Sequence, residues 1–203
     1  MTYTLAADGS SDRVLLPLLD WSLREQRLNP IVSQWADFSR IPRQPSLADK
    51  LRVAVELYPC DVLFVHRDAE GQAPELRRTE ISNAVAGRDV RHIPVIPVRM
   101  TEAWLLADEQ AIRAAAGNPS GAVELHLPEV RRLEDIPDPK QILHDALVSA
   151  TGLNARRRAR FRVAERVHLI PNYIDDYSGL NILSAFRELQ ENIRVAADAF
   201  RAG

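Results

Sequence analysis

The sequence predicts an α/β protein of three layers, in which helices cover both faces of a mainly parallel central sheet. Residues 61–66 contain an unbroken run of β-forming apolar residues, Val62 to Val65, which is typical of a strand buried on both faces. Expected strands also alternate with expected helices over the first half of the chain, the pattern of repeated βαβ units. We expect C-terminal helical additions to pack on this core.

The expected elements follow from runs of β-formers and from apolar residues at helical spacing. We expect strands at residues 3–7, 31–38, 61–66 and 92–98. We expect helices at residues 14–23, 47–57, 75–86, 102–108, 139–151, 155–165 and 182–201. Residues 1–117 would form the α/β core, and 118–203 an irregular insertion followed by helices on the same domain.

Local signals mark where several elements begin. Ser10 or Ser11 is expected to cap the first helix, and Ser46 with Asp49 has the spacing of a capping box.

Prolines restrict two further segments. They make residues 40–45 a loop that carries two arginines, and Pro94 and Pro97 make the strand at 92–98 an edge or irregular strand.

Composition excludes several classes of protein. The chain has 203 residues, 46% hydrophobic and 27% charged, which is ordinary for a globular domain. No apolar run is long enough to span a bilayer and the start lacks a signal-peptide pattern, so we expect a soluble cytoplasmic protein without membrane partners. The net charge of −2 argues against a general nucleic-acid coat. Cys60, the single cysteine, excludes an internal disulfide; we interpret it as a core residue rather than a catalytic thiol.

Four acidic residues follow the expected strands: Asp8, Asp68, Glu70 and Glu102. The carboxyl ends of parallel strands meet at one edge of a sheet, where open α/β sheets bind ligands, so we expect these carboxylates to lie together. Gathered carboxylates repel one another unless a cation separates them, and oxygen ligands without cysteine favour Mg²⁺ or Mn²⁺. Such a site suits phosphoryl chemistry.

Basic residues near these acids are candidates for binding phosphate. Arg67 and Arg99 adjoin the expected metal site, and the guanidinium fork suits phosphate oxygens. We expect His66 to be a packing residue at a strand end rather than a base.

A second basic cluster, from Arg156 to Arg166, holds six arginines. It could grip phosphates, but we favour a solvated helix face paired to acids, because only one aromatic residue is interleaved.

Three motifs in order resemble those of a known family. Asp8-Gly9-Ser10-Ser11-Asp12 and Asp68-x-Glu70 look like the two acidic motifs of the Toprim fold, usually Glu-Gly-x-x-Asp and Asp-x-Asp. The stretch Pro-Val-Arg-Met-Thr-Glu-Ala-Trp-Leu-Leu-Ala-Asp, residues 97–108, is similar to the signature of a Toprim-like group, domain-of-unknown-function family 4276. The resemblance covers roughly the first half of the chain.

The resemblance implies a Rossmann-like domain that binds Mg²⁺, related to those of OLD-type nucleases, topoisomerases and primases, with many relatives linked to phage defence. It implies that Asp8, Asp68 and Glu70 are catalytic residues and metal ligands, with Glu102 as a further ligand or a structural residue. Asp8 is one methylene shorter than the usual Glu, and Glu70 is longer than the usual Asp.

We therefore expect a Mg²⁺-dependent phosphodiester hydrolase, a nuclease that acts alone or with a partner ATPase or another defence-system protein. One alternative is a non-catalytic regulatory module that binds a nucleotide or a protein partner on a Toprim-like scaffold, which the altered acidic motifs favour. A pure nucleic-acid-binding role is a third hypothesis. Each carboxylate also has an ordinary explanation as a turn cap, a helix-start charge or a solvated side chain. The oligomeric state does not follow from the sequence.

Overall fold

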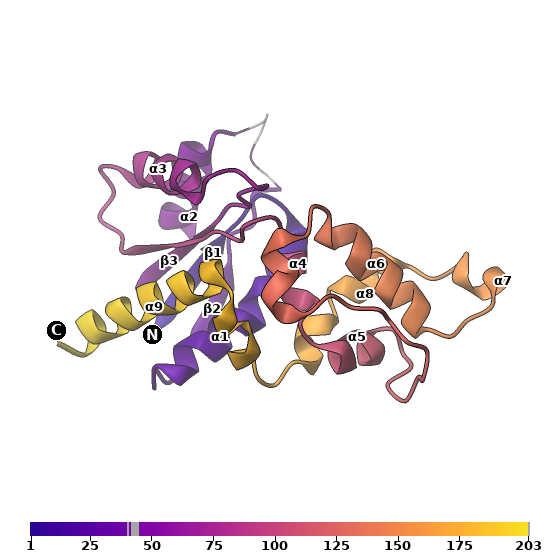
Figure 1. Ribbon diagram of the computed structural model, residues 1–203. Coiled ribbons are helices and arrows are strands. Elements are labelled where there is room, and N and C mark those ends of the chain that lie inside the picture. The colour runs from indigo at the N-terminus through magenta and orange to yellow at the C-terminus, as the bar shows by residue number, and fades with distance from the viewer. Residues whose placement is uncertain (40, 42–44, 203) are drawn as a thin grey trace.

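The computed structural model, which describes residues 1–39, 41 and 45–202, confirms the expected three-layer α/β/α fold (Figure 1). Within these residues the sheet has four strands, all parallel, in the order β2-β1-β3-β4. The strands are β1 (Thr2–Ala6), β2 (Val32–Trp35), β3 (Val62–His66) and β4 (His92–Val95). The run of β-forming residues at 62–65 therefore lies in a central strand, β3, as expected.

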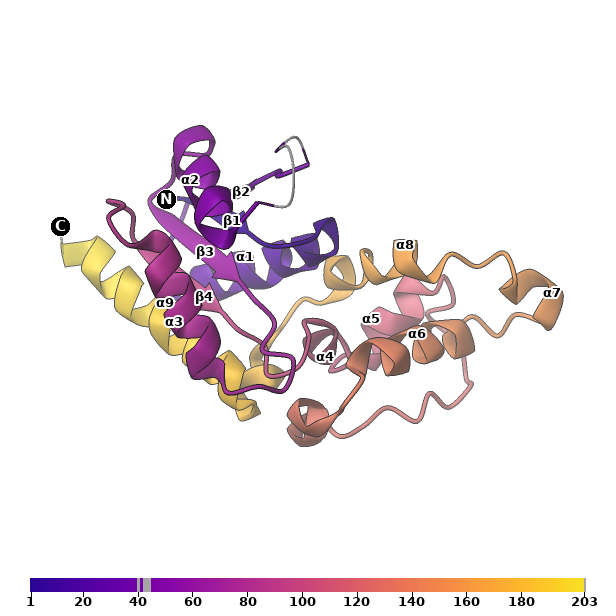
Figure 2. The same ribbon diagram turned by 90° about the horizontal axis from the view of Figure 1, so that it is seen from above.

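Helices cover both faces of the sheet. In Figures 1 and 2, α2 and α3 lie on one face and α1 and α9 on the other. These helices are α1 (Leu15–Glu25), α2 (Leu47–Leu57), α3 (Pro74–Val85) and α9 (Ser184–Ala202), and a 3₁₀ helix, η1 (Ser10–Val14), precedes α1.

The remaining helices form a lobe beside the sheet, which we call the helical lobe (residues 102–173). Figures 1 and 2 show α7 at its outer tip. Its helices are α4 (Glu102–Leu105), α5 (Glu109–Ala115), η2 (Val130–Asp135), α6 (Pro139–Ala150), α7 (Ala155–Arg158), α8 (Val163–Val167) and η3 (Ile170–Tyr173), and η4 (Ser178–Ile182) then leads to α9.

Side chains of β1 and β3 alternate between two apolar layers, as the two-residue period of a strand requires. Tyr3 and Phe64 face α1 and α9 and meet edge to face, with ring centroids 5.2 Å apart. Leu63 faces α2 and α3. The helical lobe shares the first layer, since Trp104 packs edge to face on Phe186 of α9 at 5.6 Å. The boundary expected near residue 117 stays a prediction.

Several local predictions are confirmed. Ser46 Oγ accepts a hydrogen bond from the Asp49 backbone N at 3.2 Å, and Asp49 Oδ2 accepts one from the Ser46 backbone N at 3.1 Å, which completes the capping box of α2. The strand that contains Pro94 is at the edge of the sheet, where the missing N–H costs no ladder bond. The loop expected at residues 40–45 lies largely outside the described residues.

Two local predictions are wrong. Neither Ser10 nor Ser11 caps α1, because a 3₁₀ turn comes first and Asp12, three residues after Gly9, accepts the Gly9 backbone N–H at 3.2 Å. The single helix expected at 155–165 is instead two short helices, α7 and α8. Arginines three and four residues apart repel one another on a helix face, which works against a continuous helix there.

The structure also has α5 directly after α4, a helix that was not expected from the sequence. No helix in the described ranges has both the length and the apolar character needed to cross a membrane.

Candidate functional site

A cavity of about 260 Å³ lies between the carboxyl ends of β1 and β3, and we call it the strand-end cavity. The chain runs from β1 to β2 on one side and then returns to β3 on the other, so this crevice is the switch point where open α/β folds bind ligands. The lining residues come from the end of β3, the turns after both strands, η1 and α3: Asp8, Gly9, Ser11, Asp12, His66, Arg67, Asp68, Glu70 and Arg77.

The turn after β3 is tied to the segment after β4. The Glu70 backbone N donates to the Arg99 carbonyl at 3.1 Å, and the Gly71 backbone N donates to the Val98 carbonyl at 2.8 Å. Glu70 and Gly71 both have left-handed backbone, with φ of 53° and 77°. This conformation costs a non-glycine residue roughly 1 kcal/mol and tends to occur where function requires it. The segment after β4 thus holds Glu70 in a strained position at the cavity.

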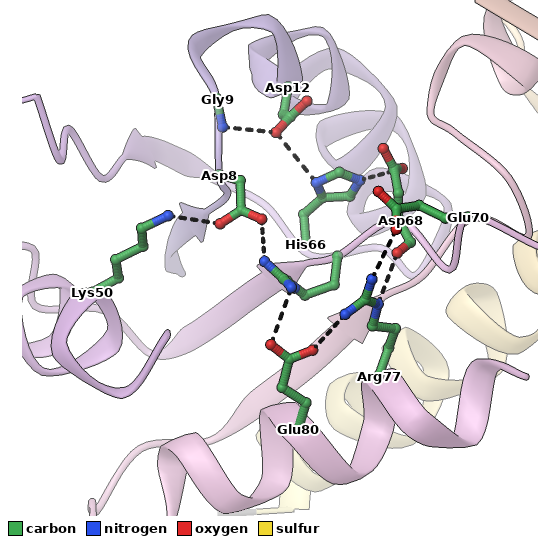
Figure 3. A network of polar contacts seen from close by, with 10 residues as sticks. Asp8, Gly9, Asp12, Lys50, His66, Asp68, Glu70, Arg77 and Glu80 are labelled. Atoms are coloured by element: carbon green, nitrogen blue, oxygen red, sulfur yellow. Dashed lines mark hydrogen bonds and ion pairs between the residues drawn. The ribbon is translucent and has the colours of Figure 1, made fainter. Parts of the chain in front are cut away.

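His66 lies between two carboxylates at the end of β3 (Figure 3). Its Nε2 is 3.1 Å from Asp68 Oδ1 and 3.0 Å from Thr101 Oγ1, and its Nδ1 is 3.4 Å from Asp12 Oδ2. The ring is 3% exposed, so the two acids face it without intervening bulk water. His66 is therefore a buried connector between the turns that follow β1 and β3, as well as a packing residue.

These contacts favour a charged His66 ring. Burial lowers the His66 pKa, but the close contacts and negative charges of Asp12 and Asp68 outweigh burial and raise it to about 9. Burial likewise raises the pKa of Asp12, but His66 and the Gly9 backbone N–H outweigh it, and the net pKa is below the ordinary value. An imidazolium between two carboxylates results, which balances part of the acidic charge of the site.

Asp8 is held by two basic side chains (Figure 3). Lys50 Nζ, from α2, donates to Asp8 Oδ1 at 2.7 Å, and Arg67 donates to Asp8 Oδ2. Arg67 also contacts Glu80 Oε1 at 3.1 Å through Nη2, while its buried Nε has no acceptor among the described residues. The first acid of the predicted site is thus paired to cations in this structure.

Arg77 of α3 connects the remaining acids (Figure 3). It contacts Glu80 Oε2 at 3.0 Å and Glu70 Oε2 at 3.2 Å, and its Nε donates to the Asp68 carbonyl at 3.0 Å. Carboxylates and cations therefore alternate along one network. A negatively charged ligand would meet the basic groups and a cation the acidic ones.

The structure brings together four of the six residues predicted for the site. Asp8, Arg67, Asp68 and Glu70 line the strand-end cavity. The other two, Arg99 and Glu102, are not among its lining residues.

Arg99 and Glu102 have other surroundings. The guanidinium of Arg99 lies over Gly71, so close that a Cβ at position 71 would be 2.1 Å from Arg99 Nη1. The Glu102 carboxylate has Lys140 Nζ at 3.9 Å. Its neighbour Thr101 reaches the site through the contact with His66.

Sequence reasoning missed Lys50, Arg77 and Glu80. Lys50 and Arg77 come from the first turns of α2 and α3, and Glu80 from the middle of α3, and no motif marks any of them. Arg77 and Glu80 have the three-residue spacing of a helical ion pair, which predicts that they meet but not that Arg77 lines the cavity.

The donor atoms of the cavity are of the type that a hard divalent cation prefers, but their arrangement does not match a metal site. The cavity offers carboxylate oxygens and no thiol, and Mg²⁺ is commonly held by one or two carboxylates with water and substrate phosphate. As the side chains are placed, however, the described residues contain no group of three or more His, Cys, Asp or Glu that could hold a metal ion. Asp8 and Glu70 are paired to basic groups instead.

Comparison with known proteins found no matching family model, no matching curated protein and no matching solved structure.

Proposed function

We propose that the chain is a Mg²⁺-dependent phosphodiester hydrolase whose reaction takes place in the strand-end cavity. One observation carries the proposal: Asp8, Asp68 and Glu70 line the same crevice at the β1–β3 switch point, beside Arg67 and Arg77. The resemblance to Toprim motifs at these positions agrees with it. Cytoplasmic location, a partner ATPase and a role in phage defence stay predictions.

The residues would have distinct tasks. Asp8 with Asp68 or Glu70 would hold the metal, which would supply Lewis acidity and an activated water at neutral pH. Arg67 and Arg77 would bind non-bridging phosphate oxygens through their guanidinium forks. The buried Arg67 Nε that lacks an acceptor supports this task. His66 would keep the turns after β1 and β3 together through Asp12 and Asp68.

The test compares metal-dependent cleavage of DNA and RNA by wild type, Asp8→Asn and Asp68→Asn. Each variant keeps its side-chain size and loses the negative charge, so we expect cleavage to fall by roughly 10²-fold or more, a typical loss when transition-state charge stabilisation is removed. Asp89→Asn is the matched control, since Asp89 is exposed after α3. Mg²⁺ titration by thermal shift should stabilise wild type and not Asp68→Asn.

Wild-type cleavage rates in both active-site variants, with folding verified by circular dichroism, would contradict this proposal. Loss of cleavage in Asp89→Asn to the same degree would also count against it.

The second candidate function is non-catalytic binding of a phosphate-bearing ligand. The observation that favours it is the pairing of Asp8 with Lys50 and Arg67, and of Glu70 with Arg77, because these cations already balance the acids. Nucleotide binding by calorimetry in EDTA, lost in Arg67→Ala and accompanied by no cleavage in Mg²⁺, would select this candidate.

A further inference from the structure

The segment from Asn154 to Arg162, which we call the arginine arm, extends from the outer end of the helical lobe. Figures 1 and 2 both place α7 at that tip, away from the sheet. None of its residues lines the strand-end cavity. The arm is therefore a separate surface whose chemistry the site described above does not use.

The arm is strongly cationic and exposed. It holds five arginines and no acidic residue, in a chain whose net charge is −2. The side chains of α7 are exposed and none of them is buried. The arginines are Arg156, Arg157, Arg158, Arg160 and Arg162.

Most of these guanidinium groups have no acidic partner. Arg162 contacts Glu165 at 2.9 Å, and Arg158 Nε donates to the Leu153 carbonyl at 2.7 Å. In the ranges that the structure describes, no carboxylate forms an ion pair with Arg156, Arg157 or Arg160. The favoured sequence interpretation, a helix face paired to acids, therefore fails for these three arginines.

The local fold presents the charge rather than hiding it. Asn154 caps α7 by accepting the Arg157 backbone N–H at 3.1 Å, and the chain then turns into α8. Phe161, the aromatic residue between the arginines, is part-buried against the core and lies under the Arg166 guanidinium at 5.7 Å. The arm thus has an apolar anchor on the inside and exposed arginines on the outside.

This chemistry selects one class of partner. A membrane-surface helix needs an outward apolar face, and a protein interface needs an apolar core, but the exposed residues of α7 are arginines and one alanine. Adjacent unpaired guanidinium groups match a row of phosphates, each fork holding two oxygens. We infer that the arginine arm binds the phosphate backbone of a nucleic acid, away from the strand-end cavity.

The inference deepens the proposed function, because a polynucleotide held at both surfaces would be a long substrate rather than a mononucleotide. The arm would raise the affinity for long strands without contacting the scissile bond. Backbone contacts of this kind carry no base specificity, so we expect DNA and RNA to bind by the same charge attraction.

The experiment measures binding in EDTA, where metal-dependent cleavage is absent. Fluorescence anisotropy follows labelled 30-nucleotide single-stranded DNA, RNA and duplex DNA over a range of salt concentrations. The arm variant is Arg156→Ala, Arg157→Ala and Arg160→Ala together. The control variant is Arg52→Ala, Arg91→Ala and Arg187→Ala, which removes the same charge from exposed positions elsewhere.

We expect the arm variant to bind at least about tenfold more weakly at 100 mM salt, and its salt dependence to decrease by about two to three phosphate contacts. The control variant should bind like wild type. Equal weakening of nucleic-acid binding in both variants, or no weakening in the arm variant, would overturn the inference. Binding to phosphatidylserine vesicles that depends on the arm, with no effect on nucleic-acid binding, would also overturn it.

A second measurement separates this inference from the proposed function. Hydrolysis of bis(p-nitrophenyl) phosphate, which is too small to reach the arm, should need Asp68 and should be unchanged in the arm variant. Arm-dependent nucleic-acid binding without any hydrolysis would keep the inference and reject the hydrolase. If hydrolysis of this ester needs Asp68 but nucleic-acid binding does not depend on the arm, the hydrolase proposal stands and the inference about the arm is rejected.

Discussion

The strand-end cavity and the arginine arm both gather basic groups, but the surroundings of those groups differ. In the cavity, Arg67 is 20% exposed and contacts both Asp8 and Glu80, whereas Arg156 and Arg157 are exposed and form no ion pair within the described residues. Guanidinium groups in the first region are part of the protein's own charge balance. The unpaired arginines of the second are balanced only by solvent and counterions, which a nucleic acid can displace. Arginine content alone therefore does not show which basic groups are already balanced by the protein; that depends on their internal partners.

The largest expected effect on stability comes from removing the charge at the centre of the cavity. His66→Gln leaves Asp12 and Asp68 without the imidazolium between them, and loss of one member of a buried charge pair costs roughly 3 kcal/mol or more of unfolding free energy. Urea unfolding at pH 6, monitored by tryptophan fluorescence, measures the difference, with exposed His168→Gln as the control. If His66→Gln is as stable as wild type, the ion pairs of the cavity contribute no more to stability than the unpaired arginines of the arm.

The pH dependence of the unfolding free energy gives a second test of the charge on His66. The His66 pKa is raised from 6.5 to about 9 on folding, so its stabilisation is complete below about pH 6.5 and is lost as the pH rises through about 9. Wild type should therefore lose roughly 3 kcal/mol between pH 6 and pH 10 that His66→Gln does not lose. Parallel curves for the two proteins would contradict a charged His66.

A smaller effect is expected at the turn that supports Glu70. Gly71 has φ of 77°, and an added Cβ would lie 2.1 Å from Arg99 Nη1, so Gly71→Ala must both strain the backbone and displace the guanidinium. We expect a loss of about 1 to 2 kcal/mol in thermal or urea unfolding. Gly87→Ala is an informative control, because it has φ of 75° but open space around it. Equal losses at both positions would mean that the Arg99 contact contributes nothing.

The smallest effect is expected at the arm. Replacing Arg156, Arg157 and Arg160 by alanine removes exposed side chains without internal ion pairs, so the unfolding free energy should change by less than about 0.5 kcal/mol for each substitution. Removal of like charges and the higher helix propensity of alanine both act in the stabilising direction. A loss above 2 kcal/mol for the triple variant would show that the arm is structural, in contrast to its open arrangement.

Local patterns in the sequence were enough for most of the fold. The apolar run of β3, the capping box at Ser46 and the edge position that Pro94 predicts for β4 each depend on a few residues, and the structure confirms all three. The turn residues Asp8 and Asp68 could also be placed at one edge, because parallel strands bring their carboxyl ends together.

What only the tertiary structure decided is which side chains from elsewhere meet those acids. Arg77 lines the cavity, and Lys50 and Glu80 contact side chains that line it. They do so because α2 and α3 pack on the sheet with a particular rotation, which depends on the whole apolar layer rather than on neighbouring residues. Arg99 does not line the cavity; its guanidinium lies over Gly71 in the turn after β3. The arm was recognisable as a basic cluster from sequence, but whether acids would pair with it depended on how the lobe folds. Short-range patterning determines the elements, whereas long-range packing determines which charges meet and which stay free.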